Sequence, residues 1–341
     1  MRCPDCNKFV GNEENEPEVE SVEVDDEGHV NAEVRIVNAC AECGTDLTEA
    51  TLSMDGEADT IPCSCKPEDR ELEAEEAVER MAAIGWKTVE LAEIHWHRIE
   101  KRHKPESQCH TLRRRADDLG IAIAQVHGLT FNFCDPKADA AAGMERAKRS
   151  LLFSATLGIK QYVFHPSSRP WGEEPGGYES VRQLNRDIVG QLADAAKPLG
   201  LGIAVENVWD HPAPRRHFGA NPEELLWLVE QTNPAVVGVC WDTGHAHLAG
   251  LDQYRALKAL GSHLRATHIQ DGDGTSDQHR LPFEGTIDWA GVLRALREIQ
   301  YEGAFNLEIG GAVHKTPLAI RSAKLRFALE LATAMVEGRV T

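Results

Sequence analysis

From residue 60 onward, short apolar runs rich in β-branched residues alternate with longer amphipathic segments. In the longer segments, apolar residues recur every three or four positions, which is typical of helices that pack through one face. The candidate strands are 60–65, 87–92, 121–127, 160–165, 201–206, 236–242, 264–269 and 304–309. Eight strands in about 280 residues, each followed by a helix, predict an α/β fold of the (β/α)8 TIM barrel type.

The helical pattern is clearest over 73–85, 110–120, 181–200, 222–232 and 289–299. Several of these segments close on glycine, a frequent C-cap. The first candidate strand, "TIPCSC", is short and polar, so it could be irregular. A doubly wound open sheet is the alternative topology, because it arises from the same alternation of strands and helices.

The third to eighth candidate strands all end on, or carry near their end, a side chain that can bind a metal. These side chains are His127, His165, Glu206, Asp242, His268 and Glu308. A single polar residue at a strand end is ordinarily a hydrogen-bonded surface group. In a parallel barrel, however, the carboxyl ends of all strands converge on one face. Six such residues at equivalent positions therefore predict a metal site.

Glu206, Asp242, His268 and Glu308 together offer one imidazole nitrogen and three carboxylates. This donor set favours Mn²⁺, Mg²⁺, Co²⁺ or Zn²⁺. The ion would neutralise the buried carboxylates and leave coordination positions open for substrate oxygens.

The first 59 residues have a different pattern. Two CxxC pairs, Cys3 with Cys6 and Cys40 with Cys43, flank an alternating stretch that predicts a β-hairpin around "DDEGH". Four thiolates in two such pairs suit a structural Zn²⁺. We therefore expect a zinc-ribbon-like module at 1–59 and the barrel at 60–341; a redox or partner-docking role for the module is an alternative.

The distribution of charge supports the same domain boundary after residue 59. The net charge is −19, and residues 1–59 contain 17 acidic against 3 basic side chains, whereas the remainder contains 38 against 33. Proteins that bind nucleic acid ordinarily carry a basic stripe, so no nucleic-acid partner is expected.

The sequence also predicts where the protein is found. "MRCPDCNKFV" lacks the apolar core of a signal peptide, and no apolar run approaches the roughly 20 residues of a membrane span. With nine cysteines, an odd number, and two CxxC pairs, the chain is expected in the reducing cytoplasm, away from membranes.

Five ordered motifs carry a family resemblance: "VFHPSS", "AVENVW", "WDTGHAHLAG", "THIQDGDGTSDQHRLPFEGTIDW" and "FNLEIGG". They resemble the xylose-isomerase-like TIM barrels known as sugar phosphate isomerases/epimerases. The resemblance covers about residues 60–335 and implies that Glu206, Asp242, His268 and Glu308 hold one divalent ion. It also implies that Glu206 and Glu308 are the catalytic pair, one removing a proton next to the substrate carbonyl and the other returning it.

A second branch of this superfamily, the endonuclease IV-type enzymes, uses more ligands around three zinc ions. The chain is similar to that branch at His127, His165, His245, Asp277 and His279, which are therefore possible further ligands. His245 could equally orient a ligand instead of binding metal itself.

Candidate substrate-binding residues lie in loops that follow predicted strands. Arg215 and Arg216 could bind a phosphate or carboxylate, although solvated loop charges are the alternative. Arg169 and Trp171 lie in a Gly/Pro-rich loop that could cover the site, and Trp171 or Trp209 could stack on a sugar ring.

The sequence thus predicts a metal-dependent isomerase or epimerase of a small sugar, sugar phosphate or polyol that acts through an enediolate, with a homo-oligomer as one option for its assembly. One alternative is an endonuclease IV-like zinc phosphodiesterase that acts on abasic DNA. A second alternative is a catalytically silent sugar-binding barrel.

Overall fold

The computed structural model describes residues 18–24, 30–35, 72–168, 177–209, 217–314 and 316–340. The chain divides into two compact units, Met1–Glu73 and Ala74–Thr341. The predicted boundary after residue 59 and the predicted first strand at 60–65 lie outside the described residues, so both stay predictions.

In the first unit, β1 (Glu18–Val24) pairs with β2 (Val30–Arg35) in antiparallel register, with Val24 opposite Val30. This pairing agrees with the hairpin expected from the alternating sequence. The four cysteines expected to bind zinc, Cys3, Cys6, Cys40 and Cys43, lie outside the described residues.

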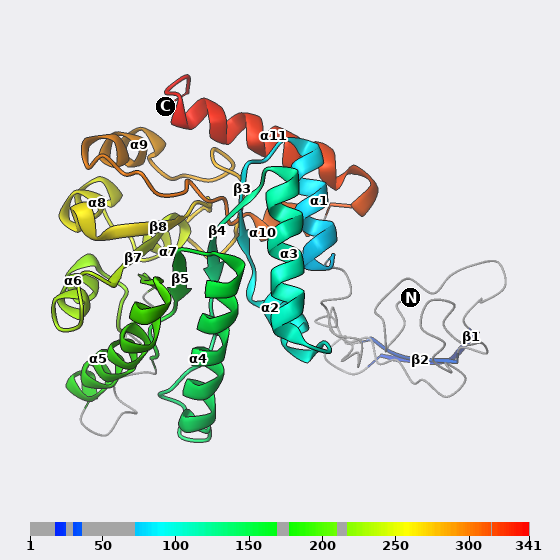
Figure 1. Cartoon of the computed structure of the whole chain (residues 1–341). Coiled ribbons are helices and arrows are strands. Elements are labelled where there is room, and N and C mark those ends of the chain that lie inside the picture. Colours follow the sequence, from blue (N-terminus) through cyan, green and yellow to red (C-terminus); the bar gives the residue numbers. More distant parts are fainter. Residues whose placement is uncertain are drawn as a thin grey trace. The chain divides into compact units, whose positions relative to one another are not determined.

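The second unit is built around six parallel strands (Figure 1), with each strand hydrogen-bonded to the next along the chain. They are β3 (Thr88–Leu91), β4 (Ala122–His127), β5 (Gln161–Phe164), β6 (Gly202–Glu206), β7 (Val237–Asp242) and β8 (Leu264–His268). The order β3-β4-β5-β6-β7-β8 follows the chain without reversal. A doubly wound sheet would reverse direction at a switch point, so this order is that of a TIM barrel.

The eighth predicted strand, at 304–309, is wrong as a regular strand. Only a parallel bridge between Ile269 and Leu307 forms there, with hydrogen bonds from Ile269 N to Asn306 O (2.7 Å) and from Glu308 N to Ile269 O (3.0 Å). The Thr267 hydroxyl donates to Ala304 O (2.7 Å) and accepts from Asn306 N (3.3 Å). A side chain thus takes main-chain partners that a regular ladder would use.

Helices connect the strands and surround them. They are α1 (Ala74–Ile84), α2 (Glu93–Lys101), α3 (Pro105–Leu119), α4 (Ala140–Leu157), α5 (Gly177–Ala196), α6 (Pro222–Glu230), α7 (Thr243–Leu248), α8 (Gln253–Leu260), α9 (Trp289–Glu298), α10 (Gly310–Val313) and α11 (Leu318–Val336), with short 3-10 turns at Lys197–Leu199 and Gly261–His263. All five helices expected from the sequence form within a few residues of their predicted limits. Side-chain caps start several of them: Asp139 accepts from Ala142 N, and Asn221 accepts from Glu224 N.

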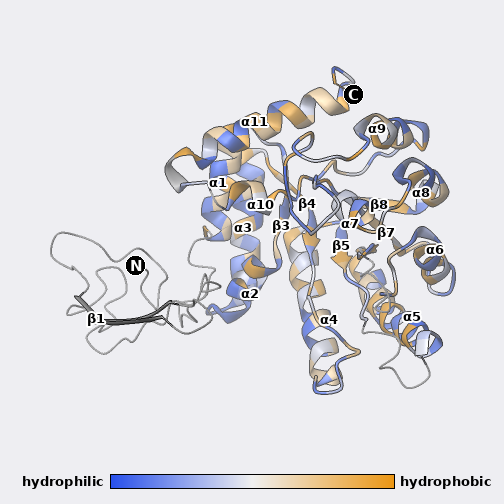
Figure 2. Ribbon diagram, turned by 180° about the vertical axis from the view of Figure 1, so that it is seen from behind, coloured by the Kyte–Doolittle hydropathy of each residue, from blue (hydrophilic) through white to orange (hydrophobic). Residues whose placement is uncertain are grey.

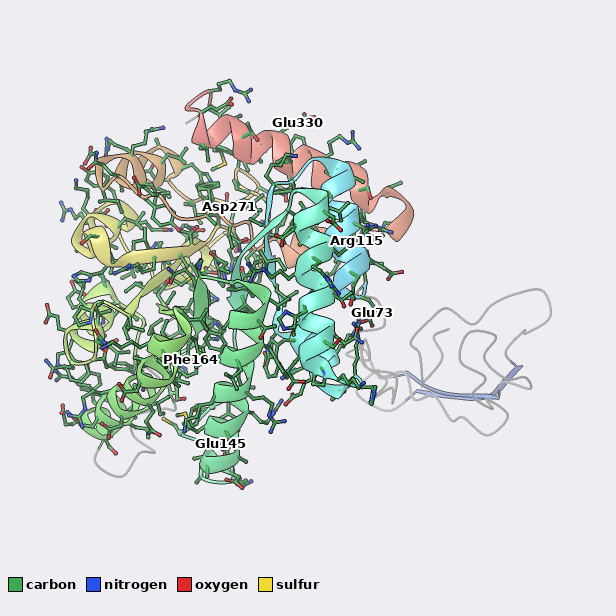
Figure 3. All side chains as sticks on the ribbon, viewed as in Figure 1. Glu73, Arg115, Glu145, Phe164, Asp271 and Glu330 are labelled. Carbon is green, nitrogen blue, oxygen red and sulfur yellow. The ribbon has the colours of Figure 1, made fainter. Side chains whose placement is uncertain are left out.

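The core has two layers. Inside the curve of strands, Val163, Ala204, Cys240 and Ala266 contact one another. Outside it, the apolar faces of the helices pack on the strands, as the hydropathy colouring shows (Figure 2). In Figure 3, Asp271 lies at the centre of this unit, whereas Arg115, Glu145 and Glu330 lie on the outer helices. No helix among the described residues has the length and apolar character needed to cross a membrane.

One buried hydrogen bond gives a direct test of this packing. The fully buried Tyr162 hydroxyl accepts from Leu129 N (2.8 Å) and lies 2.6 Å from Ser150 Oγ. Tyr162→Phe leaves the Leu129 N–H without its partner, so we expect the free energy of unfolding to fall by about 1–3 kcal/mol in urea denaturation. The control is Tyr254→Phe, which removes an exposed bond to Glu298 (2.9 Å) and should change stability by at most about 0.5 kcal/mol. Equal effects of the two substitutions would contradict the buried hydrogen bond at Tyr162.

Candidate metal centre

The carboxyl ends of three neighbouring strands place three of the predicted ligands. Glu206 ends β6, Asp242 ends β7 and His268 ends β8, while Glu308 directly follows the bridge residue Leu307. One ligand atom from each of these four residues lies within 4.8 Å of those from the other three. The structure therefore gathers residues that are spread over about 100 positions of the sequence into a single group.

Three atoms of this group have no hydrogen-bond partner in the described part of the chain, although they are buried: Glu206 Oε1, His268 Nδ1 and Glu308 Oε2. His268 Nδ1 is 3.1 Å from Glu206 Oε1 and 3.2 Å from Glu308 Oε2. These atoms approach as ion pairs but form no hydrogen bonds, and buried polar atoms without hydrogen bonds cost free energy. Their convergence, in a set of three carboxylates and one imidazole, fits a divalent cation.

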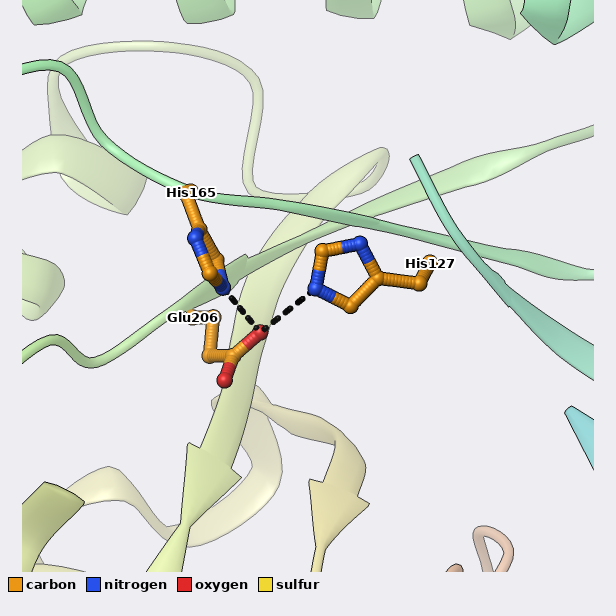
Figure 4. Close-up of side chains that lie close together, drawn as sticks. All are labelled: His127, His165 and Glu206. Atoms are coloured by element: carbon orange, nitrogen blue, oxygen red, sulfur yellow. Dashed lines mark hydrogen bonds and ion pairs between the residues drawn. The ribbon is translucent and has the colours of Figure 1, made fainter. Parts of the chain in front are cut away.

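A second group uses the other oxygen of Glu206 (Figure 4). His165, which directly follows β5, has its Nε2 2.9 Å from Glu206 Oε2, and His127 at the end of β4 has its Nε2 4.0 Å from the same oxygen. Glu206 thus joins both groups, with one carboxylate oxygen in each.

A third group consists of His245, Asp277 and His279. Asp277 Oδ2 is 2.9 Å from His279 Nε2 and 3.6 Å from His245 Nε2. His245 Nδ1 lies 2.9 Å from the carbonyl oxygen of Asn207, so its Nε2 is the nitrogen that faces Asp277. All nine predicted ligands therefore lie in three adjoining groups.

A sequence match over the part of the chain that carries this site identifies its family. The family model described as "Xylose isomerase-like TIM barrel" matches residues 78–328. The chain belongs to this family.

The chain is also similar to curated proteins, one of which is named as an isomerase. The inosose isomerase of Bacillus subtilis is 29% identical over 160 residues, which cover 45% of this chain and 55% of that protein. The chain spans about half the length of the first curated relatives that it matches.

Two solved structures share the fold. A D-psicose 3-epimerase in the presence of D-fructose has a TM-score of 0.64 at 21% identity, covering 78% of this chain and 95% of that one. The IOLI protein with a bound zinc atom has a TM-score of 0.66 at 21% identity, covering 79% of this chain and 95% of that one.

The ionisable side chains of the group formed by Glu206, Asp242, His268 and Glu308 change one another's pKa values. Burial opposes a charge on His268, but the surrounding carboxylates of Glu206, Glu308 and Glu90 more than offset this and hold the pKa of His268 well above its usual range. Burial, with the nearby carboxylates of Glu206 and Asp242, raises the pKa of Glu308 to about 8. Without a cation, protons on His268 and Glu308 therefore partly balance the buried carboxylates.

The third group is also strongly charged. Burial opposes a charge on both of its histidines, but for His245 the carboxylates of Asp242 and Asp277 prevail and raise the pKa to about 10. For His279 the hydrogen bond that it donates to Asp277 prevails and raises the pKa to about 9. Despite burial, the same two histidines hold the pKa of Asp277 below its ordinary value.

Two neutral amides position these ligands, and sequence reasoning did not identify either. Buried Gln270 donates through Nε2 to Asp242 Oδ2 (3.0 Å) and Asp277 Oδ1 (3.1 Å), and its Oε1 accepts from His279 N (2.8 Å). Asn207 accepts from Asp242 N (2.6 Å) and donates to Asp242 O (2.9 Å). Their positions one residue after Glu206 and two after His268 were the available signal, since both continue a strand that carries a ligand.

A buried aspartate fixes the loop that carries Asp277 and His279. The Asp271 carboxylate accepts from Gly272 N (2.8 Å), Phe283 N (2.8 Å) and Trp289 Nε1 (2.8 Å). It thereby joins the two ends of the loop between β8 and α9.

The predicted substrate-binding residues fall into two classes. Trp209 is described, and its ring lies 4.8 Å from that of His245, at the edge of the third group. Arg169, Trp171, Arg215 and Arg216 lie outside the described residues and stay predictions.

The coupled charges predict how metal binding depends on pH. An ion must displace the protons from His268 and Glu308, because both pKa values are raised in its absence. We expect Mn²⁺ to bind more tightly as the pH rises from 6 to 8, by about tenfold per pH unit for each proton displaced. Titration calorimetry in two buffers of different ionisation enthalpy would measure the protons released.

The matched control is Glu308→Gln, which should release fewer protons on binding because one of the two groups no longer titrates. Mn²⁺ is suitable because thiolates such as those at the N-terminus favour softer ions. Equal affinity at pH 6 and pH 8, with no proton release, would contradict these assignments.

Proposed function

We propose that the protein is a divalent-metal-dependent isomerase or epimerase of a small sugar, sugar phosphate or polyol. The observation that carries this proposal is the convergence of Glu206 Oε1, His268 Nδ1 and Glu308 Oε2, buried and without hydrogen-bond partners among the described residues. Sugar-active relatives, among them an inosose isomerase, support the substrate class.

A bound divalent ion would polarise the substrate carbonyl and stabilise the negative charge that develops on its oxygen. Glu206, Asp242, His268 and Glu308 would hold it, and Mn²⁺, Mg²⁺, Co²⁺ and Zn²⁺ all suit this donor set. Cys3, Cys6, Cys40 and Cys43 remain our proposal for a separate structural Zn²⁺.

Glu206 and Glu308 are the proposed acid–base pair. Although burial raises the pKa of Glu206, His268 and His165 lower it well below its usual range, whereas that of Glu308 is raised. These pKa values apply to the site without a metal, because a bound ion would displace the proton from Glu308. One of the two carboxylates takes the proton next to the substrate carbonyl, and the other returns a proton to the resulting enediolate.

Trp209 is the described candidate for contact with the substrate. Its indole lies beside His245, where it could pack against the apolar face of a sugar ring. We also propose, from the sequence, that Arg169, Trp171, Arg215 and Arg216 contact the substrate and that the protein acts in the cytoplasm.

A zinc phosphodiesterase of the endonuclease IV type is the second candidate, because all nine possible ligands lie in three groups. The charge of the chain argues against phosphodiesterase activity on DNA. Residues 60–341 contain 38 acidic and 33 basic side chains, whereas gripping a DNA backbone takes roughly six to ten phosphate contacts, mostly from Lys and Arg.

Solvent exchange separates the candidates. With Mn²⁺ in D₂O, the protein should catalyse deuterium incorporation next to the carbonyl of a substrate in a panel of ketoses and inososes, detected by NMR. Glu206→Gln and Glu308→Gln should each lower the exchange rate by about 10²–10⁴-fold. Glu145→Gln, which removes an exposed carboxylate on α4, should not change it.

The other outcomes identify the alternatives. Sugar binding without exchange would favour a catalytically silent barrel. Cleavage of an abasic-site duplex by the Zn²⁺-loaded protein, with no exchange into any sugar, would favour the phosphodiesterase.

A further inference from the structure

Glu90 lies outside the predicted ligand set but contacts one of its members. It lies near the end of β3, with its side chain 12% exposed. Both of its carboxylate oxygens are 3.0 Å from His268 Nε2. The other ring nitrogen, Nδ1, faces Glu206 and Glu308. The imidazole of His268 therefore lies between Glu90 on one side and two proposed ligands on the other.

Two amides complete the surroundings of Glu90. Gln125 Nε2 donates to Glu90 Oε2 (3.2 Å), and Asn306 Nδ2 donates to the same oxygen. Gln125 is almost fully buried, and its Nε2 also donates to Thr267 O (3.3 Å). Both amides therefore hold the Glu90 carboxylate in place through their N–H groups, and Oε1 is left to accept from His268.

The contact also joins the two ends of the sheet. Glu90 is on β3 and His268 is on β8, the first and last strands in the sheet order. Asn306 comes from the irregular segment that pairs with β8 only through a bridge. The strands therefore curve until β3 and β8 face each other, and the Glu90–His268 pair spans the interior between them.

We propose that Glu90 is a positioning residue of the metal centre. Because a carboxylate accepts hydrogen bonds, it requires the proton of a neutral His268 to be on Nε2, and this leaves the Nδ1 lone pair directed at Glu206 and Glu308. Glu90 also fixes the plane of the ring. The inference rests on the proposed function, since it assigns His268 as a metal ligand.

Replacement of Glu90 by glutamine tests the role with little change in shape. An amide at this position presents a donor either to His268 Nε2–H, which opposes the proposed tautomer, or to the amide N–H groups of Gln125 and Asn306, which then no longer hold residue 90 in place. We expect the Kd for Mn²⁺ to rise about 10- to 100-fold, measured in the full chain by the EPR signal of free Mn²⁺. The thermal midpoint of the metal-free variant should meanwhile stay close to that of the wild type.

Glu93→Gln is the matched control. Glu93 lies three residues further on, at the start of α2, and accepts from Thr130 N (3.0 Å). The substitution removes the same charge close by in the chain, but it touches none of the proposed ligands. Its Kd for Mn²⁺ should stay within about twofold of the wild-type value.

A measurement on the wild type covers the case in which Glu90→Gln does not fold. In the Zn²⁺-loaded protein labelled with [¹⁵N]histidine, His268 should carry its proton on Nε2; its signals are identified by their loss in His268→Gln. A proton on Nδ1 would overturn the proposal.

The remaining outcomes are distinguishable. If the wild type binds Mn²⁺ and Glu90→Gln binds it equally well, with or without a lower thermal midpoint, Glu90 has only a structural role and the proposed function stands. If the wild type binds neither Mn²⁺ nor Zn²⁺ through His268, both the proposed function and the role of Glu90 are wrong.

Discussion

Negative charge buried at the carboxyl end of the sheet is the constraint on which this site depends. Glu206 and Asp242 are almost completely withdrawn from water, and Glu308 lies close to both. Like charges this close repel strongly in a medium of low dielectric constant. Without a cation, protons on His268 and Glu308 partly relieve the repulsion. A divalent ion would relieve it more fully, because it adds two positive charges at the point where Glu206 Oε1, His268 Nδ1 and Glu308 Oε2 meet.

The fold supplies this arrangement through strand order and through neutral hydrogen-bond donors. Parallel strands that follow the chain bring Glu206, Asp242 and His268 to one edge. Asp242 is also the N-cap of α7, where its Oδ1 accepts from His245 N (2.7 Å). One carboxylate thus links the end of a strand, the start of a helix and the candidate metal site. The backbone N–H of His245 therefore fixes the orientation of the Asp242 carboxylate, and a backbone donor is more rigid than a donor on an exposed side chain.

Much of this could be predicted from the sequence, because an apolar strand and the polar residue that ends it are both visible in a short stretch of sequence. The run "VVGVCWD" is apolar up to its last residue, and β7 is buried along its entire length, so both the strand and its terminal carboxylate were identifiable. The rule that parallel strands end on one face then brought four distant ligands together. The strand expected at 304–309 failed because Thr267, on another strand, takes its main-chain partners, and no local pattern reports such a contact. Gln270 and Glu90 were missed for a related reason: their roles depend on partners in other segments, and alternation with apolar neighbours makes each resemble an ordinary strand residue.

The central claim is that Glu206, Asp242, His268 and Glu308 share one cation. Diffraction from crystals of the protein grown with Mn²⁺, with data collected on both sides of the manganese absorption edge, tests it most directly. The account predicts an anomalous peak in contact with an atom of each of these four side chains. A peak elsewhere, or none at a Mn²⁺ concentration that saturates the protein in solution, would contradict it.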